Sequence, residues 1–301
     1  MKILLLSLQY PFTIASYFIK ALRNREDVEL KLIGPDYGNW IPWKGGMKLK
    51  PEYAPLADFP LQMFKGRMPC AIPPMFVQNL GWEPDLILNI DAGCYLTGHP
   101  GIPYYVVATD AHVLRYDLQR GIADRFYNMH HRYSKPGDID LPYAYSPDWH
   151  YPEEVEKKYD VCMLGLQYQH RIKVEKLLDQ AGISSYFDVG EVYDEYRKAY
   201  CAARVGLNWA SMDDLNARHF ELLAMGIPSV QYRTTDADLF FEAGKDYLAF
   251  KTAQQAVTQI KYLLANKEAA DAMVKSGLKA VAPHTYDARV DQIIKDYNGS
   301  L

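Results

Sequence analysis

Three polar side chains in the second half of the chain have the types and spacing that an anion site needs. Asn216, Arg218 and Glu221 fall on the first turns of a predicted helix, where free backbone N–H groups and the helix dipole attract negative charge. A cation beside a hydrogen-bonding carboxylate suits a sugar phosphate, and a nucleotide diphosphate would fit there. The competing interpretation is an amphipathic helix whose polar face is only solvated.

The elements that carry these side chains follow from the local sequence. Asp213 and Asp214 can cap the free N–H groups of a helix that opens near residues 215–216. Gly226 ends this helix, and Pro228 starts a strand. The run from 211 to 232 therefore predicts a loop, a helix, a tight turn and a buried strand.

The pattern N-x-R-x-F-E-x-x-A-M-G-x-P, from Asn216 to Pro228, resembles the donor-site signature of GT-B glycosyltransferases. It is most similar to the CgeB-like, spore maturation branch of the group 1 family. Retaining members of the wider family carry two acidic residues in an E-x7-E pattern, and the second holds the nucleotide ribose. The resemblance implies that Glu221 binds the ribose and that Asp213, which keeps the charge on a shorter side chain, acts near the donor sugar.

Length and charge limit what the chain can be. Its 301 residues suit two domains of roughly 150 residues each. The 33 basic and 37 acidic side chains give a formal charge of -4, which argues against a general polyanion binder but leaves room for a local basic patch. We expect an N-terminal domain over 1–150, a nucleotide-sugar domain over 151–282 and a final helix over 283–301, with 149–158 as the linker.

Neither a membrane segment nor a cysteine framework is expected. The N-terminal run MKILLLSLQYPF reads as a buried strand, and no stretch approaches the ~20 apolar residues of a membrane span. No C-x-x-C pair occurs, so a zinc site or a disulfide framework is not expected. The four cysteines are Cys70, Cys94, Cys162 and Cys201. The sequence therefore predicts a cytoplasmic protein.

The first half begins with a β-α-β pattern and then places polar residues after strands. The loop 9–13 lacks a G-x-G-x-x-G, which lowers the case for a dinucleotide there. Asp110 and His112 follow a predicted strand over 104–108, and ligands sit beyond the carboxyl ends of such strands. The T-D-A-H stretch resembles the D-x-H of CgeB-like proteins. We expect Asp110 to orient His112 and His112 to lie near the reacting sugar; alternatively, Asp110 caps the helix that follows.

Two other parts of the first half carry candidate binding groups. Residues 34–81 are irregular and can serve either as an acceptor-side loop or as a packed surface insertion. Their aromatic and basic residues are Trp40, Trp43, Lys44, Lys48, Lys50, Tyr53, Phe59, Phe64, Lys65, Arg67 and Phe76. His130 and His131 fall in a predicted helical stretch over 114–132, where neighbours point about 100° apart and would not chelate one metal. A final strand is predicted over 141–148.

The second half restarts the alternation of strands and helices. A strand over 159–164 leads through a loop that starts at Gly165 to a helix. The phrase YDVCMLGLQYQHR resembles the start of the family's donor domain. Arg171, at the entrance of that helix, can clamp a diphosphate; alternatively, it is a surface arginine. Gly190 can let a nucleotide base approach the backbone.

We therefore predict an α/β protein with two Rossmann-like domains in the GT-B architecture, facing across a cleft, and a C-terminal helix that crosses back to the first domain. The resemblance implies transfer of a sugar from a nucleotide diphosphate sugar, UDP-sugar favoured, with retention and with neither a metal nor another cofactor. The catalytic candidates are Asp110, His112, Asp213 and Arg218, and the donor-binding candidates are Arg171, Gly165, Gly190, Asn216, Arg218 and Glu221.

The acceptor stays open between a small molecule, a glycan, a protein and nucleic acid. One alternative is a different enzyme on the same fold, either a glycosyltransferase that modifies nucleic-acid bases or a sugar-nucleotide epimerase. The other alternative is a noncatalytic two-lobed binder of sugars or nucleotides, because a fold does not determine a function.

Overall fold

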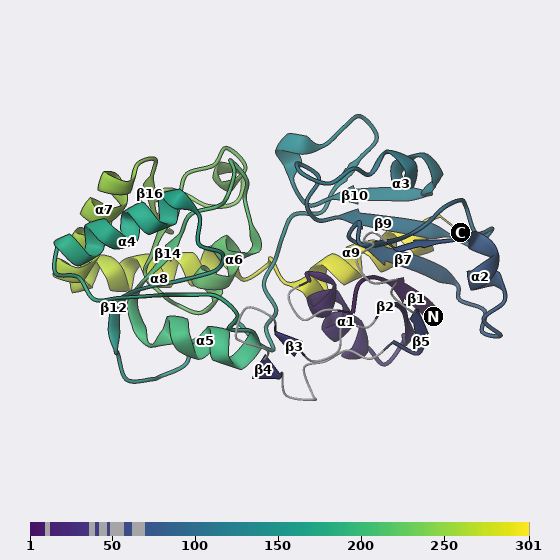
Figure 1. The fold of residues 1–301 in the computed structure, drawn as a ribbon, viewed down its shortest axis with the longest axis horizontal. Coiled ribbons are helices and arrows are strands. Elements are labelled where there is room, and N and C mark those ends of the chain that lie inside the picture. The colour runs from purple at the N-terminus through teal and green to yellow at the C-terminus, as the bar shows by residue number, and fades with distance from the viewer. Residues whose placement is uncertain (10–12, 36–39, 42–46, 49–56, 62–69, 301) are drawn as a thin grey trace. The chain divides into compact units, whose positions relative to one another are not determined.

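The computed structural model describes residues 1–9, 13–35, 40–41, 47–48, 57–61 and 70–300. The chain divides into two compact units (Figure 1). The first comprises Met1–Pro42, Gly46–Pro142 and Arg289–Leu301, and the second comprises Trp43–Gly45 and Tyr143–Ala288. Each unit is built on its own parallel sheet, so the predicted α/β class is confirmed.

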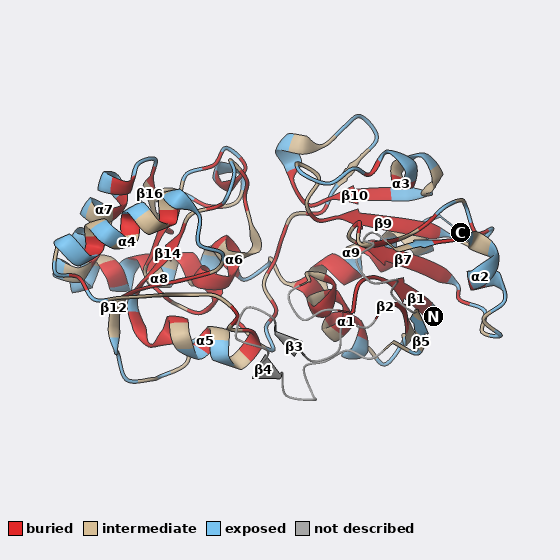
Figure 2. Ribbon diagram, viewed as in Figure 1, coloured by how far each residue is buried: buried red, intermediate tan, exposed pale blue. Residues whose placement is uncertain are grey.

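The first unit contains a seven-stranded sheet in the order β11-β10-β9-β7-β1-β2-β5, with every pairing parallel. Its strands are β1 (Lys2–Leu6), β2 (Glu29–Pro35), β5 (Phe59–Leu61), β7 (Leu86–Ile90), β9 (Tyr104–Ala108), β10 (Arg125–Asn128) and β11 (Ile139–Asp140). The central strands read as continuous apolar runs because both faces of a parallel sheet are covered. Figure 2 shows these strands as buried.

Helices and short strands complete the first unit. They are α1 (Ala15–Arg23), β3 (Trp40–Ile41), β4 (Met47–Lys48), β6 (Cys70–Ile72), α2 (Pro74–Gln78), β8 (Cys94–Leu96), α3 (Asp117–Ile122) and the 3-10 helix η3 (His131–Tyr133). The C-terminal helix α9 (Tyr286–Asn298) contributes its residues from Arg289 onward. Tyr127 Oη donates to Asp296 Oδ2 at 2.8 Å, so this helix packs on the first sheet.

The four cysteines are free, yet two of them are neighbours in space. Cys70 lies opposite Cys94 in the β6–β8 pairing. A hydrogen bond with the Cys94 thiol lowers the pKa of Cys70 to about 7, although burial acts in the opposite direction. The sequence does not indicate this contact, because the two cysteines are far apart in the chain and only the pairing of β6 with β8 brings them together.

One sequence-based expectation for the first half holds only in part, and another is wrong. The helical stretch expected within 114–132 is the short helix α3, which is followed by β10 and η3, and 141–148 contain neither a strand nor a helix. Leu141, Tyr143 and Ala144 are nevertheless buried. Their apolar character reflects packing of an extended segment without a ladder, which periodicity does not distinguish from a strand. Most of the predicted aromatic and basic stretch, Trp43, Lys44, Lys50, Tyr53, Phe64, Lys65 and Arg67, lies outside the described residues, as do 10–12 of the first loop.

The second unit contains a five-stranded parallel sheet in the order β13-β12-β14-β15-β16. Its strands are β12 (Tyr159–Leu164), β13 (Ser185–Asp188), β14 (Ala203–Asn208), β15 (Ser229–Tyr232) and β16 (Leu248–Phe250). Counted within the unit, this is the order 2-1-3-4-5 of a doubly wound fold. The order reverses between β12 and β14, and ligands of such folds bind at that point.

Helices cover both faces of the second sheet. They are α4 (Gln169–Gln180), α5 (Tyr193–Cys201), α6 (Ala217–Ala224), α7 (Ala253–Ala265) and α8 (Lys267–Val281), with the 3-10 helix η4 (Ala237–Leu239). Val161 and Met163 pack with residues of α4 and α7, whereas Cys162 and Leu164 pack with residues of α5 and α6. The alternation follows from the two-residue period of a strand. Across the described residues, no helix is both long enough and apolar enough to span a bilayer.

Gly34 tests the packing of the first unit. A Cβ at this position would lie 1.8 Å from the backbone oxygen of Ser7, and β1 and β2 are adjacent strands that cannot separate there without breaking their ladder. We expect Gly34→Ala to destabilise the protein by about 3 kcal/mol, measured by urea denaturation. Gly121→Ala is the control because its Cβ meets nothing within 4 Å. Equal stability of the two variants would contradict this packing.

His219, on α6, is a buried core histidine. It is 2% exposed and its ring stacks on Phe241 at a centroid distance of 5.1 Å. Burial lowers its pKa from 6.5 to about 3, so the folded protein keeps this imidazole neutral. Because the unfolded chain takes up the proton and the folded chain does not, stability contributed here is present above pH 6.5 and is lost as the pH falls from 6.5 toward 3.

We expect His219→Phe to reduce the slope of unfolding free energy against pH in this window by up to about 1.4 kcal/mol per pH unit. Denaturant titrations at several pH values between 4 and 6.5 measure it. His219→Gln separates charge from packing: it loses stability at every pH but shows the same flattened slope. A wild-type slope in both variants would show that His219 is not the group that titrates.

Candidate active site

The candidate site of the second unit lies at the carboxyl ends of β12 and β14, where the strand order reverses. Gly165 follows β12, and Asn208 ends β14. These two strands are hydrogen-bonded neighbours. Side chains and backbone groups that follow them therefore converge on one edge of the sheet.

Arg171 ties the two strand ends together from the first turn of α4. Its Nε and Nη2 atoms donate to the Trp209 carbonyl at 3.0 and 2.6 Å, and its Nη1 atom donates to the Leu166 carbonyl at 2.8 Å. The residue is 4% exposed. Burial first, and then the positive charge of Arg218, lower the pKa of Arg171 to about 10. The guanidinium therefore remains protonated at neutral pH. Because the side chain is buried, the alternative of a surface arginine is wrong.

Arg218, from α6, approaches the same glycine. A Cβ on Gly165 would lie 2.9 Å from Arg218 Nη2 and 3.0 Å from Arg171 Nη1. The φ angle of Gly165 is +131°, which a residue with a side chain rarely adopts. Within the described residues, neither guanidinium has an ion pair, and the buried Arg218 Nε atom has no hydrogen-bond partner. Burial lowers the pKa of Arg218, but Tyr200, Tyr196 and the charge of Glu221 raise it above its ordinary value. Two cations thus share one pocket edge, and Glu221 compensates only part of their charge.

Glu221 lies one turn further along α6 and is 5% exposed. Tyr196 Oη donates to its Oε2 atom at 2.6 Å, and His150 Nε2 lies 3.8 Å from its Oε1 atom. Burial, followed by the charge of Glu221, raises the pKa of Tyr196 well above its ordinary value, so the phenol keeps the proton that it donates. Burial lowers the pKa of His150. The carboxylate is therefore oriented by one hydrogen bond, from Tyr196, and His150 lies beside it beyond hydrogen-bond distance.

Asn216 occupies the N-cap position of α6, which begins at Ala217. Asn208 Nδ2 donates to Asn216 Oδ1 at 3.0 Å, and Arg218 Nη1 donates to Asn208 Oδ1 at 3.4 Å. The expected capping by Asp213 and Asp214 is wrong because the helix begins one to two residues later than expected, at Ala217, with Asn216 as its N-cap. Asp214 instead accepts a hydrogen bond from the Met212 amide at 3.2 Å, and Asp213 lies in the preceding bend, partly exposed.

Gly190 lies two residues beyond β13, the neighbour of β12. It is buried and has a φ of +106°. The Gly165 amide donates to the Asp188 carbonyl at 2.8 Å, which joins the loops after β12 and β13. Gly190 therefore lies at the same edge of the sheet as the two arginines.

Asp110 and His112 belong to the first unit, in the turn after β9. No helix begins near Val113, since α3 starts at Asp117, so the helix-cap alternative for Asp110 is wrong. Thr109 Oγ1 donates to Asp110 Oδ2 at 3.2 Å. The His112 ring stacks on Tyr133 at a centroid distance of 5.3 Å.

His130 packs edge-on against His112, with ring centroids 4.6 Å apart. It lies beyond β10 in extended backbone rather than on the expected helix. Burial, and then the charge of His112, lower the pKa of His130 from 6.5 to about 3. The neighbour relevant to His130 is therefore His112 and not the adjacent His131, which contacts Asp140.

The structure thus brings Gly165, Arg171, Asn216, Arg218 and Glu221 together in the second unit and Asp110 with His112 in the first. Sequence reasoning missed Asn208, Tyr196 and His150, and it considered His130 only together with His131. Asn208 and His130 carried a usable signal, because each is a polar residue at the carboxyl end of a strand. The other two, the buried His150 and the half-buried Tyr196, are neighbours of Glu221 and carried none.

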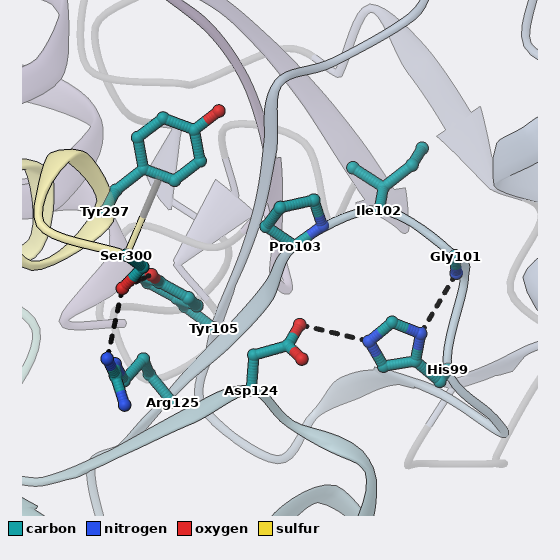
Figure 3. A pocket seen from close by; sticks show the side chains of 9 residues that line it. All are labelled: His99, Gly101, Ile102, Pro103, Tyr105, Asp124, Arg125, Tyr297 and Ser300. Atoms are coloured by element: carbon teal, nitrogen blue, oxygen red, sulfur yellow. Dashed lines mark hydrogen bonds and ion pairs between the residues drawn. The ribbon is translucent and has the colours of Figure 1, made fainter.

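A separate cavity of about 400 Å³ lies in the first unit, at the amino ends of β9 and β10 and therefore at the other end of these strands from Asp110 and His112 (Figure 3). It is lined by His99, Gly101, Ile102, Pro103, Tyr105, Asp124, Arg125, Tyr297 and Ser300. His99 contacts Asp124 at 3.0 Å and Arg125 donates to Ser300 at 3.0 Å, so its polar groups are paired with one another. None of the predicted site residues lines it.

Comparisons with known proteins agree with this fold. Residues 157–295 match a family model described as glycosyl transferase-like. Sucrose-phosphate synthase from Thermosynechococcus elongatus is 13% identical with a TM-score of 0.65, and HepE from Anabaena, in complex with UDP and glucose, is 10% identical with a TM-score of 0.66; both matches cover 100% of each chain. The pneumococcal O-GlcNAc transferase GtfA, in complex with UDP and GlcNAc, is 12% identical, with 75% of this chain and 59% of GtfA covered and a TM-score of 0.52.

No curated protein matches the chain. At such low identities the structural matches establish the fold alone. The match to the glycosyl transferase-like model covers residues 157–295, and the chain as a whole has the GT-B fold of the two structures that match it over its full length.

Proposed function

We propose that the protein is a glycosyltransferase that moves a sugar from a nucleotide diphosphate sugar, with UDP as the favoured nucleotide, to the hydroxyl group of an acceptor. The family match over 157–295 and the UDP named in two of the similar structures support this proposal. The motif from Asn216 to Pro228 supports a place among the CgeB-like members.

One observation carries the proposal: the guanidinium groups of Arg171 and Arg218 converge on Gly165 at the strand-order reversal. Two like charges in a partly dry site repel one another unless an anion lies between them. A diphosphate carries that charge and accepts the paired hydrogen bonds that guanidinium groups donate. Glu221, on the same helix as Arg218, supplies a carboxylate for the ribose hydroxyls.

Transfer breaks the bond between the anomeric carbon and a diphosphate oxygen and forms a bond to an acceptor oxygen, which releases its proton. Negative charge grows on the diphosphate as it leaves. Arg171 and Arg218 then bind the leaving group more strongly than the intact donor, and this difference lowers the barrier. Asn216 and the N-terminus of α6 position the phosphates, and Gly190 leaves room for the base. The charge of the leaving group is thus balanced in the second unit by side chains rather than by a metal.

Asp110, His112 and Asp213 are the groups proposed to act on the sugar and the acceptor. We propose retention at the anomeric carbon because the acidic pair Asp213 and Glu221 is similar to the pair of the retaining family. The side chain of Asp213 is shorter than that of a glutamate. Contact with the donor sugar therefore requires that the sugar lies close to the bend 211–213.

Replacement of Arg218 tests the diphosphate contact. We expect Arg218→Gln to weaken UDP binding roughly 10- to 100-fold, because hydrogen bonds to charged groups contribute about 1.5–3 kcal/mol. UDP-dependent thermal shifts measure the change, since a ligand that binds only the folded state raises its stability. The slow release of free sugar from UDP-sugar without an acceptor should fall as well.

Arg204→Gln is the matched control because Arg204 is an exposed arginine of the same unit, paired with Asp160 at 3.1 Å. It should bind UDP like the wild type. If the two variants bind UDP equally, the assigned diphosphate site is wrong. If the wild type binds UDP-sugar tightly but releases no sugar and modifies no acceptor, the protein is a binder rather than an enzyme.

Gly165 tests the convergence itself. We expect Gly165→Ala to weaken UDP binding because its Cβ would displace Arg218 Nη2, 2.9 Å away, and crowd Arg171 Nη1, 3.0 Å away. Gly182→Ala is the control: Gly182 also has a positive φ, +67°, but its Cβ meets nothing within 4 Å. Both variants should lose about 1–2 kcal/mol of stability through backbone strain. Loss of UDP affinity in both, or in neither, would contradict the proposed pocket.

A further inference from the structure

Three side chains of the first unit form a cluster that the diphosphate site does not use. Asp110, His112 and His130 each offer a ligand atom, and these atoms lie within 4.8 Å of one another. For three atoms at this spacing there is always a point that lies within about 2.8 Å of all three. Zinc-type ions bind nitrogen and oxygen at about 2.0–2.2 Å, so a closure of less than about 1 Å per ligand completes the site.

The sheet fixes the positions of these residues. Asp110 and His112 follow β9, and His130 follows β10, its parallel neighbour, in which Asn128 pairs with Ala108. Both strands thus deliver their ligands at the same edge. Asp110 reaches solvent, so an ion can enter from outside and the carboxylate can close on it.

Hydrogen bonds with residues around the cluster hold two of the three candidate ligands in position. The His130 ring, 1% exposed, hydrogen-bonds to the backbone of Thr109. The side chain of Thr109 donates to Asp110 at 3.2 Å. One residue thus orients two of the three ligands, in the way that backbone and hydroxyl groups fix histidine and carboxylate ligands around bound metals.

His112 supplies a second, independent observation. Its Nδ1 atom is buried, yet it has no hydrogen-bond partner within the described part of the chain. A buried polar atom without a partner costs about 1–3 kcal/mol. Stacking on Tyr133 holds the ring in this orientation. A cation that accepts the lone pair of an imidazole nitrogen removes that cost.

The donor set determines the class of ion. Two imidazoles with one carboxylate suit Zn²⁺, Co²⁺, Ni²⁺ or Fe²⁺, whereas Mg²⁺ and Ca²⁺ prefer sets of oxygen atoms. Asp91 interacts electrostatically with Asp110 and adds negative charge near the cluster. Three protein ligands leave a coordination position for a water or a substrate oxygen.

We propose that Asp110, His112 and His130 bind one divalent transition-metal ion in the first unit. The proposal does not rest on the glycosyltransferase function, since none of the three residues belongs to the diphosphate site. It departs from the sequence-based expectation that no metal site exists, which treated His130 together with His131 on one helix. The cluster instead joins His130 to residues 18 and 20 positions earlier in the chain.

The test uses the untagged full-length protein after treatment with a chelator. Titration with Co²⁺, followed by visible absorption, and titration with Zn²⁺, followed by calorimetry, should each give one site per chain. His112→Ala and Asp110→Ala should weaken binding by more than the roughly 10- to 100-fold loss that is typical of outer contacts. Circular dichroism verifies that both variants are folded, and the buried His130 is left in place for this reason.

His131→Ala is the control, because His131 neighbours the cluster in sequence but contacts Asp140 instead. It should bind Co²⁺ like the wild type. Absence of a one-to-one site, or equal affinity in His112→Ala and the wild type, would overturn the proposal. UDP binding, measured with and without chelator, should not change, so failure of the metal site and failure of the diphosphate site give different results.

Discussion

The second unit depends on the approach of two guanidinium groups to one glycine. Arg171 donates three hydrogen bonds to the carbonyls of Leu166 and Trp209, and these bonds fix the position of its guanidinium group. Arg218 makes a 3.4 Å contact to Asn208 and a hydrogen bond with Tyr196. Burial and mutual repulsion oppose the charge of Arg171, whereas Tyr200, Tyr196 and Glu221 favour the charge of Arg218. Two guanidinium groups held close together in this way favour the binding of an anion.

Much of the fold could be predicted from sequence because parallel strands covered on both faces are short apolar runs. The strands 104–108 and 159–164 were predicted at their observed bounds. The prediction failed between 109 and 148, where buried residues such as Tyr143 belong to irregular chain. Burial alone does not produce a ladder, and sequence periodicity reports burial more directly than it reports pairing.

The candidate site could be predicted only where chemistry and local position coincide. Arg171 and Arg218 stand at helix entrances, which a motif records. The partners of Glu221 do not: Tyr196 and His150 lie 25 and 71 positions away in sequence and meet it only after α5 and α6 pack on the same face. Likewise, the pairing of His112 with His130 follows from the register of β9 and β10. Contacts of this kind are consequences of tertiary structure, so one sequence does not reveal them.

The same topological rule operates in both units with different chemistry. In the second unit the carboxyl ends of β12 and β14 present cations, which suit a leaving diphosphate. In the first unit the ends of β9 and β10 present two imidazoles and a carboxylate, which suit a cation. In the proposed reaction Arg171 and Arg218 would balance the charge of the diphosphate, so an ion bound in the first unit would have a different role. With three protein ligands it would keep one coordination position for a water or another oxygen, which it would polarise.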